Sequence, residues 1–185
     1  MRMAGIVTVA TVMGLAAVSP AGAQEQRTVG ITMGYPASIG VLWRVSDKVA
    51  IRPELSFAGG QSDVALSSFV SETDGWSAGT GVSALFYLHK YEHLRTYVSP
   101  RFTYGHSTST VTNSAFTVSK TTNDNSSTGA GGSFGAQYSL GDRFAVFGEL
   151  GFAFSHRTSS TNTTATKIGG KAWGTQSAVG VVFFP

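Results

Sequence analysis

The stretches KVAIRPELSFA (48–58), RTYVSPRFTYG (95–105) and RFAVFGELGFA (143–153) share one pattern. Each begins with a cation, continues in alternation of apolar and small or polar residues, and has Pro or Gly five residues after the cation. A period of two predicts β-strands with one apolar face. The cations are 47 (95 − 48) and then 48 (143 − 95) residues apart. This interval fits a down-and-up strand pair with one long connection, so the sequence predicts a meander barrel.

The two faces of these strands differ in charge as well as in size. One face is apolar except for Thr96, whereas the other is largely small or polar and carries Arg52, Glu54, Arg101 and Glu149. The last three follow their strand-starting cation by six residues. We expect all four side chains to point into the barrel and to pair with one another, because unpaired charges in a packed interior are costly. A proton- or ion-conducting gate is the alternative reading of this cluster.

The first 23 residues have the features of a secretory signal peptide. Arg2 precedes an apolar run over 5–18, and Ala21-Gly22-Ala23 has the small-x-small pattern of a cleavage site. The run is too short to cross a bilayer well. We therefore expect residues 1–23 to be a cleaved signal peptide and residues 24–185, which number 162 (185 − 23), to form one barrel domain.

The composition excludes several functional classes. Charged residues make up 12% of the chain, against roughly 25% in an ordinary soluble domain. The chain has no cysteine, so no disulfide framework or thiol nucleophile is predicted. The formal net charge is only +3 and the cations are scattered, which argues against a nucleic-acid partner. No cofactor or metal site is predicted.

Alternation over the rest of the chain predicts eight strands and two kinds of connection. Tight turns are expected at 46–47, 89–94 and 141–142, whereas long connections rich in Ser, Thr and Asn are expected at 59–75, 107–128 and 157–171. Only the connection from Tyr35 to Ile39 is short where a long one is expected. Short turns at one end and polar loops at the other are typical of outer-membrane barrels. The strands are expected at about 29–35, 39–45, 76–88, 130–140 and 173–184, with the repeated stretches as the third, fifth and seventh.

The apolar face is predicted to meet lipid. Nine residues of alternation match the 9–11 or so that a tilted strand needs to cross a bilayer. A soluble barrel would have Lys and Glu over its outer face, and this chain has few of either. Aromatic residues near the strand ends predict two interfacial girdles. One comprises Tyr35, Phe57, Trp76, Tyr104, Phe152 and Trp173, and the other Trp43, Phe86, Tyr138, Phe144 and Phe183.

Together with the C-terminal AVGVVFFP (178–185), these features resemble the eight-stranded outer-membrane β-barrel family of the OmpA and OmpX kind. Gly180, Val181 and Phe183 match the family's C-terminal assembly signal, but Pro185 stands where a final aromatic is expected. The resemblance implies an all-β, eight-stranded antiparallel up-and-down transmembrane β-barrel in a Gram-negative outer membrane. It also implies a monomer that contacts outer-membrane lipid and lipopolysaccharide, and that meets the assembly machinery through its C-terminal strand.

Three functional classes remain open from the sequence. The favoured one is a non-enzymatic barrel with a side-chain-filled lumen and a structural or adhesion-like role for its polar loops. A soluble secreted ligand-binding barrel is the second. A lipid-modifying surface enzyme is the third, with His106 or His156 as its base, although no acidic residue nearby on the strand would orient His106. His89 and His93 flank a tight turn and are expected to be solvated.

Overall fold

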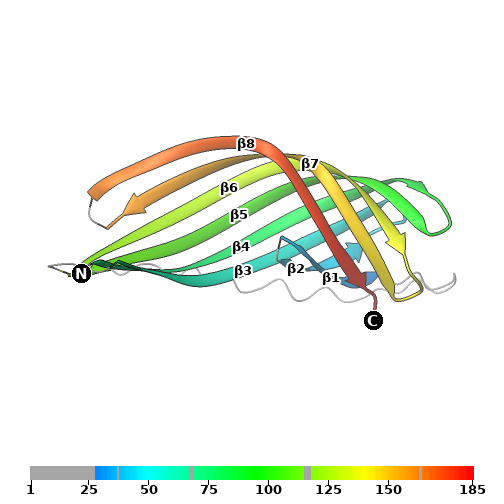
Figure 1. Cartoon of the computed structure of the whole chain (residues 1–185). Coiled ribbons are helices and arrows are strands. Elements are labelled where there is room, and N and C mark those ends of the chain that lie inside the picture. The colour runs from blue at the N-terminus through cyan, green and yellow to red at the C-terminus, as the bar shows by residue number, and fades with distance from the viewer. Residues whose placement is uncertain (1–27, 37, 67–68, 115–117, 163) are drawn as a thin grey trace.

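The computed structural model describes residues 28–185 except 37, 67–68, 115–117 and 163, and it is a closed barrel (Figure 1). Eight strands pair antiparallel in sequence order, and the last pairs with the first. The predicted eight-stranded up-and-down fold is confirmed. The strands are β1 (Val29–Tyr35), β2 (Ser38–Arg44), β3 (Val49–Leu66), β4 (Phe69–Lys90), β5 (Leu94–Ser114), β6 (Val118–Ser139), β7 (Phe144–Thr161) and β8 (Thr164–Phe183).

The predicted signal peptide, residues 1–23, lies outside the described residues. Among the residues that are described, no helix is long and apolar enough to cross a bilayer.

The strand register fixes the tilt of the barrel wall. Cross-strand partners lead from Met33 on β1 round the barrel to Lys171 on β8. Met33 is itself paired with Val181. The stagger is thus ten residues (181 − 171), which for eight strands corresponds to a tilt of about 40°.

The strands from β3 to β8 are much longer than the sequence predicted. The predicted long loops at 59–75, 107–128 and 157–171 are mostly strand, since β3–β4, β5–β6 and β7–β8 continue as paired hairpins almost to their tips. The loop prediction is therefore wrong. In the outer parts of these hairpins both faces are mostly polar, so the alternation that identifies a strand is lost. Cross-strand hydrogen bonds such as Thr110 to Thr122 hold the hairpins together.

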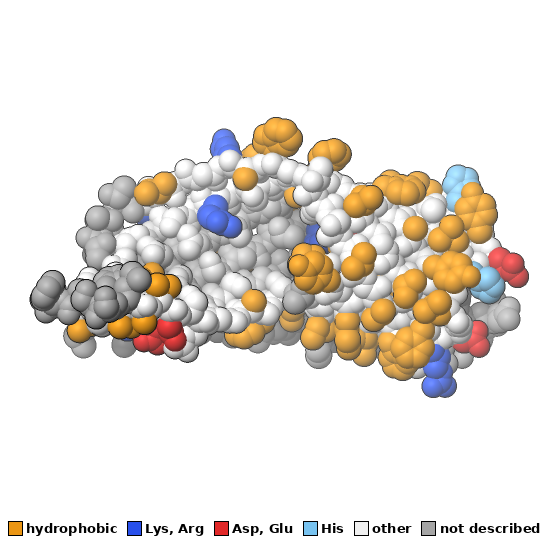
Figure 2. Space-filling view, in the orientation of Figure 1, with side chains coloured by type: hydrophobic (Ala, Val, Ile, Leu, Met, Phe, Trp, Pro, Cys, Tyr) orange, Lys and Arg blue, Asp and Glu red, His pale blue; other side chains and the backbone are white. Residues whose placement is uncertain are grey.

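The β1–β2 hairpin is short, as the sequence indicated, and this makes the barrel wall uneven. The six strands β3 to β8 extend well beyond it and form a trough that curves away from the closed part (Figure 1). One side of the molecule is consequently hollow where the trough begins (Figure 2).

Outward side chains of the closed part form an apolar surface (Figure 2). All residues of the two predicted girdles are exposed except Phe183, which is half-buried against Phe144 at 5.0 Å between ring centroids. Inward side chains at the tight-turn end form a small buried core, which we call the apolar plug. It consists of Leu42, Ala50, Leu85, Tyr97, Ala145, Phe147, Val182 and Phe184.

Tyr97 fits into the plug only because its neighbour on β6 is a glycine. Gly135 pairs with Tyr97, and a Cβ built on Gly135 would lie 2.5 Å from two carbons of the Tyr97 ring. Real Cβ atoms do not approach that closely. The absent side chain of Gly135 thus provides the space in which the ring lies.

Gly135→Ala is expected to lower the free energy of unfolding by about 1–3 kcal/mol, as overpacking of a core does. The matched control is Gly132→Ala, three residues away on the same strand but facing outward, where an added Cβ meets nothing within 4 Å. Urea unfolding of the protein in detergent micelles would measure both. Equal effects of the two substitutions would contradict this account of Tyr97.

Candidate functional site

The lumen is layered, and the order of inward residues along the strands defines the layers. On β5 the inward residues run from Tyr97 in the apolar plug through Ser99 to Arg101, and on β3 from Ala50 in the plug through Arg52 to Glu54. The charged residues therefore lie above the plug, toward the long hairpins.

The four predicted lumen charges form one connected chain. Arg52 Nε lies 2.6 Å from Glu54 Oε1, and Arg52 Nη2 lies 2.7 Å from Glu149 Oε1. Arg101 Nη2 forms an ion pair with the second carboxylate oxygen of Glu54. Read from the plug outward, the charges alternate as Glu149, Arg52, Glu54 and Arg101. We call this group the lumen ion chain. Its net charge is zero, and its outer end is a cation.

Neutral groups complete the inner end of the chain. Tyr97 Oη donates a hydrogen bond of 2.8 Å to Glu149 Oε1, and Ser133 Oγ donates one of 3.3 Å to Glu149 Oε2. The Arg52 guanidinium lies 5.0 Å from the centre of the Phe147 ring. Arg52 is 2% exposed and Glu54 is 7% exposed, whereas Arg101 is 23% exposed. The lumen ion chain thus runs from a buried inner end to a partly exposed outer end.

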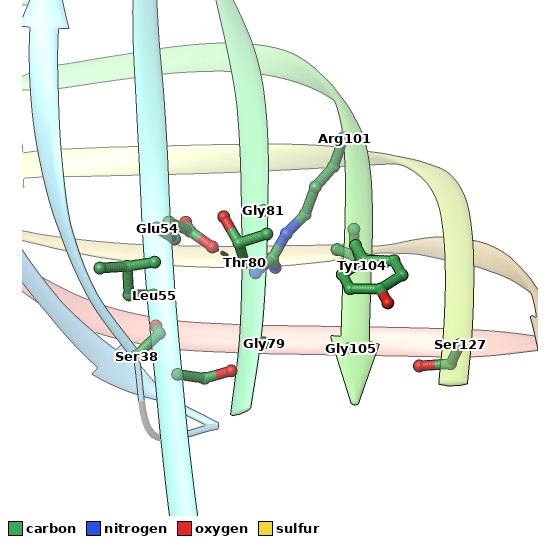
Figure 3. Close-up of a pocket in the computed structure, with 12 residues that line it drawn as sticks. Ser38, Glu54, Leu55, Gly79, Thr80, Gly81, Arg101, Tyr104, Gly105 and Ser127 are labelled. Carbon is green, nitrogen blue, oxygen red and sulfur yellow. Dashed lines mark hydrogen bonds and ion pairs between the residues drawn. The ribbon is translucent and has the colours of Figure 1, made fainter. Parts of the chain in front are cut away.

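A cavity of about 210 Å³ lies next to Arg101 on the side of the long hairpins (Figure 3). Hydroxyl side chains line much of it, together with three glycines. The hydroxyl residues are Ser38, Ser56, Thr80, Thr103, Tyr104 and Ser127, and the glycines are Gly79, Gly81 and Gly105. A Cβ on Gly79 would come within 2.6 Å of Ser56 Oγ, and one on Gly105 within 2.9 Å of Ser127 Oγ. The glycines therefore keep this space open.

The sequence identified the charges of the lumen but missed their partners. Tyr97 and Ser133 lie on the inward faces of their strands, as alternation indicates, yet nothing in the sequence distinguishes them from other inward residues. Two further lumen cations were also missed. Arg44 lies over the Phe184 ring and Arg95 over the Tyr87 ring, at 4.6 and 5.7 Å from the ring centres.

The histidines are not assembled into a catalytic site within the described part of the chain. His106 faces outward, 5.7 Å from the Trp76 ring centre, and its Nδ1 lies 3.3 Å from Ser126 Oγ. His156 is exposed, and its cross-strand neighbours are Thr128 and Lys171. No group of three metal-binding side chains occurs among the described residues. His89 and His93 lie near the tight turn and are exposed.

Known proteins resemble this chain in structure and not in sequence. No protein-family model matches the sequence, and no curated protein matches it. The structure is similar to that of a major outer membrane protein from Thermus thermophilus, with 12% sequence identity and a TM-score of 0.58 over 84% of this chain and 97% of that one. The crystal structure of Acinetobacter baumannii CarO gives 13% identity and a TM-score of 0.48 over 88% of this chain and 100% of that one.

Arg52 is expected to matter more for stability than Arg101. Arg52→Ala leaves Glu149 without any charged partner in the lumen ion chain. The free energy of unfolding should fall by about 3–5 kcal/mol, as it does when one partner of a buried ion pair is removed. Arg101→Ala should cost less, because Glu54 keeps Arg52 and Arg101 is partly solvated. Unfolding midpoints in detergent micelles would compare the two variants. A larger loss for Arg101→Ala would contradict the arrangement of the lumen ion chain.

Proposed function

We propose that the protein is a monomeric integral barrel of the Gram-negative outer membrane, exported through a cleaved signal peptide, with a filled lumen and a rigid polar surface outside the cell. The observation that carries this proposal is the exposed apolar band around a closed strand ladder. Closure pairs the backbone groups of the wall, as a hydrocarbon solvent requires. A soluble monomer rarely exposes apolar patches of more than a few hundred Å².

The height of the band fits a bilayer. On β7 the outward apolar residues run from Phe144 to Phe154, ten residue intervals (154 − 144). At about 3.4 Å per residue and a tilt of about 40°, this corresponds to about 26 Å along the barrel axis. Apolar bands of outer-membrane barrels are about 25 Å tall. The match favours an integral membrane protein over the soluble secreted barrel.

The lumen supports a structural role. The apolar plug and the lumen ion chain fill the closed part of the barrel with buried side chains. Eight strands leave an interior just wide enough for such packing. We therefore propose no permanent pore and no enzymatic activity.

The long hairpins support a surface-interaction role. Their outer parts carry hydroxyl, amide and carboxylate groups that bond across strands, such as Thr108 to Asp124 and Gln61 to Glu72. Paired strands hold this polar surface in a fixed shape, which suits adhesion-like contact with another surface. Lipopolysaccharide is expected to contact the outward face of the barrel next to these long hairpins.

The C-terminal strand is the proposed contact with the assembly machinery. β8 ends at Phe183, whose ring packs on Phe144, and the Phe184 amide donates a hydrogen bond to Arg143 O. Phe184 points inward and is 5% exposed. Of the last two aromatics, only Phe183 is therefore on the outward face together with Val179 and Val181.

Leu150→Arg tests whether the band meets lipid. Leu150 is 72% exposed and lies near the middle of the band, where an arginine should lower the stability of the inserted barrel by about 2–4 kcal/mol. Thr158→Arg, eight residues further along the same outward face and beyond the band, is the control and should have little effect. Fractionation with the outer membrane and unfolding in lipid vesicles provide the measurements. A barrel recovered without detergent, or one that tolerates both substitutions equally, would contradict the proposal.

Pro185→Phe tests the role of the terminus in assembly. Pro185 is exposed and follows the end of β8, so a ring at this position should raise the yield of folded barrel in the outer membrane without changing its melting temperature appreciably. Comparison of heat-dependent gel mobility in outer-membrane fractions would measure the yield. Equal yields, or a clear gain in thermal stability, would count against this interpretation.

A further inference from the structure

The barrel wall has an opening above the β1–β2 hairpin. The last pairs on either side of this hairpin are Tyr35 with Val179 and Ile39 with Leu55. Beyond them, residues 164–178 of β8 pair only with β7 and residues 56–66 of β3 pair only with β4, among the described strands. The two unpaired edges enclose the hollow seen in Figure 2.

The part of this opening nearest the β1–β2 hairpin lies within the apolar band. Trp173 is on β8, six residues beyond Val179 (179 − 173), and Phe57 is on β3, two residues beyond Leu55 (57 − 55). Both belong to the aromatic girdle on the side of the long hairpins, together with Trp76 and Tyr104, and are exposed. Unpaired backbone groups facing hydrocarbon would cost several kcal/mol each, so polar partners are required along this part of the edges.

The side chains at the opening are polar where the rest of the band is apolar. The outward face of β8 continues from Val181 and Val179 to Ser177 and Thr175 before it reaches Trp173. Ser177 and Thr175 begin where β8 loses its β1 partner, and both are exposed. On the facing edge, Ser56 is the first residue beyond the last β2 pair and lines the cavity beside Arg101. The opening thus leads from the outward face of the band to the cavity.

The cavity suits a small anionic group. The lumen ion chain ends in Arg101, and Glu54, its partner, is shared with Arg52. Arg101 Nε is buried and has no hydrogen-bond partner among the described residues. Hydroxyl side chains, Ser38 and Ser127 among them, line the cavity into which Arg101 extends (Figure 3). A volume of about 210 Å³ is below the 300–1,000 Å³ or so of sites that enclose a whole drug-sized ligand.

We infer that a single-chain amphiphile of the fatty-acid class binds here, with its carboxylate beside Arg101 and its acyl chain passing through the opening into the lipid. The inference rests on the proposed position in the membrane, since the acyl chain needs lipid beside the opening. The carboxylate would accept charge-assisted hydrogen bonds from Arg101. The acyl chain would remain in hydrocarbon, because hydroxyl and charged side chains make up much of the cavity lining.

Laurate is a suitable probe for the protein inserted in phosphatidylcholine nanodiscs. Radiolabelled laurate bound beyond that taken up by empty nanodiscs should saturate at one molecule per barrel. Arg101→Gln should weaken binding about tenfold or more, as loss of a charge-assisted hydrogen bond does. Gly79→Val, whose added Cβ would meet Ser56 Oγ on the cavity wall at 2.6 Å, narrows the cavity and should weaken binding similarly. Gly60→Val is the control, since a Cβ there meets nothing within 4 Å, and should bind like the native protein.

Three results would overturn the inference. Uptake that does not saturate would mean partition into the bilayer, and equal binding of methyl laurate would exclude a role for the carboxylate. Displacement of laurate by equimolar inorganic phosphate would indicate an anion site to which the acyl chain contributes no binding. Heat-dependent gel mobility separates failure of the inference from failure of the proposed function. A barrel that inserts into the membrane but binds no laurate refutes only the inference. A barrel that fails to insert refutes the proposed membrane position.

Discussion

Pairing of β8 with β1 is the interaction on which the rest of the structure depends. Five residue pairs, from Ile31 with Phe183 to Tyr35 with Val179, join the two ends of the strand order. They turn an open meander into a ring, and where β1 and β2 complete this ring the backbone groups of the wall are paired without an edge. They also set the ten-residue stagger, and with it the tilt and the narrow interior. Because the interior is narrow, inward positions must alternate small residues with the few large ones that fit.

The charges in the lumen follow from the same constraint. A ring of eight strands brings inward residues of opposite walls within reach of one another, so Arg52 on β3 can contact Glu149 on β7. These groups are far apart along the chain, and their pairing holds opposite walls together. Arg52 contacts two carboxylates, and Glu149 also accepts hydrogen bonds from Tyr97 and Ser133. Closure therefore brings these groups together, and their pairing stabilises the closed form.

Alternation allowed the barrel and the four lumen charges to be predicted, because each inward charge lies on a strand with a clear apolar face. The same signal failed beyond the band. Residues such as Thr110 and Thr122 bond across β5 and β6 in a hairpin whose two faces are both mostly polar, so their sequence looks like that of a loop. Tyr97 could not be assigned to the ion chain, because its contact with Glu149 depends on the stagger between β5 and β7. The opening beside Arg101 also depends on register, although the short Tyr35–Ile39 connection marks its position in the sequence.

The absence of cysteine from the chain allows a direct measurement of which face meets lipid. Single cysteines placed along residues 145–153 of β7 can carry nitroxide labels, and their collision rates with oxygen and with a water-soluble nickel complex can be measured in lipid vesicles. The account predicts a period of two, with high oxygen and low nickel accessibility at Val146, Leu150 and Phe152, and lower oxygen accessibility at the inward positions between them. Uniform accessibility along the strand, or nickel access at the outward positions, would contradict a barrel whose apolar face is solvated by lipid.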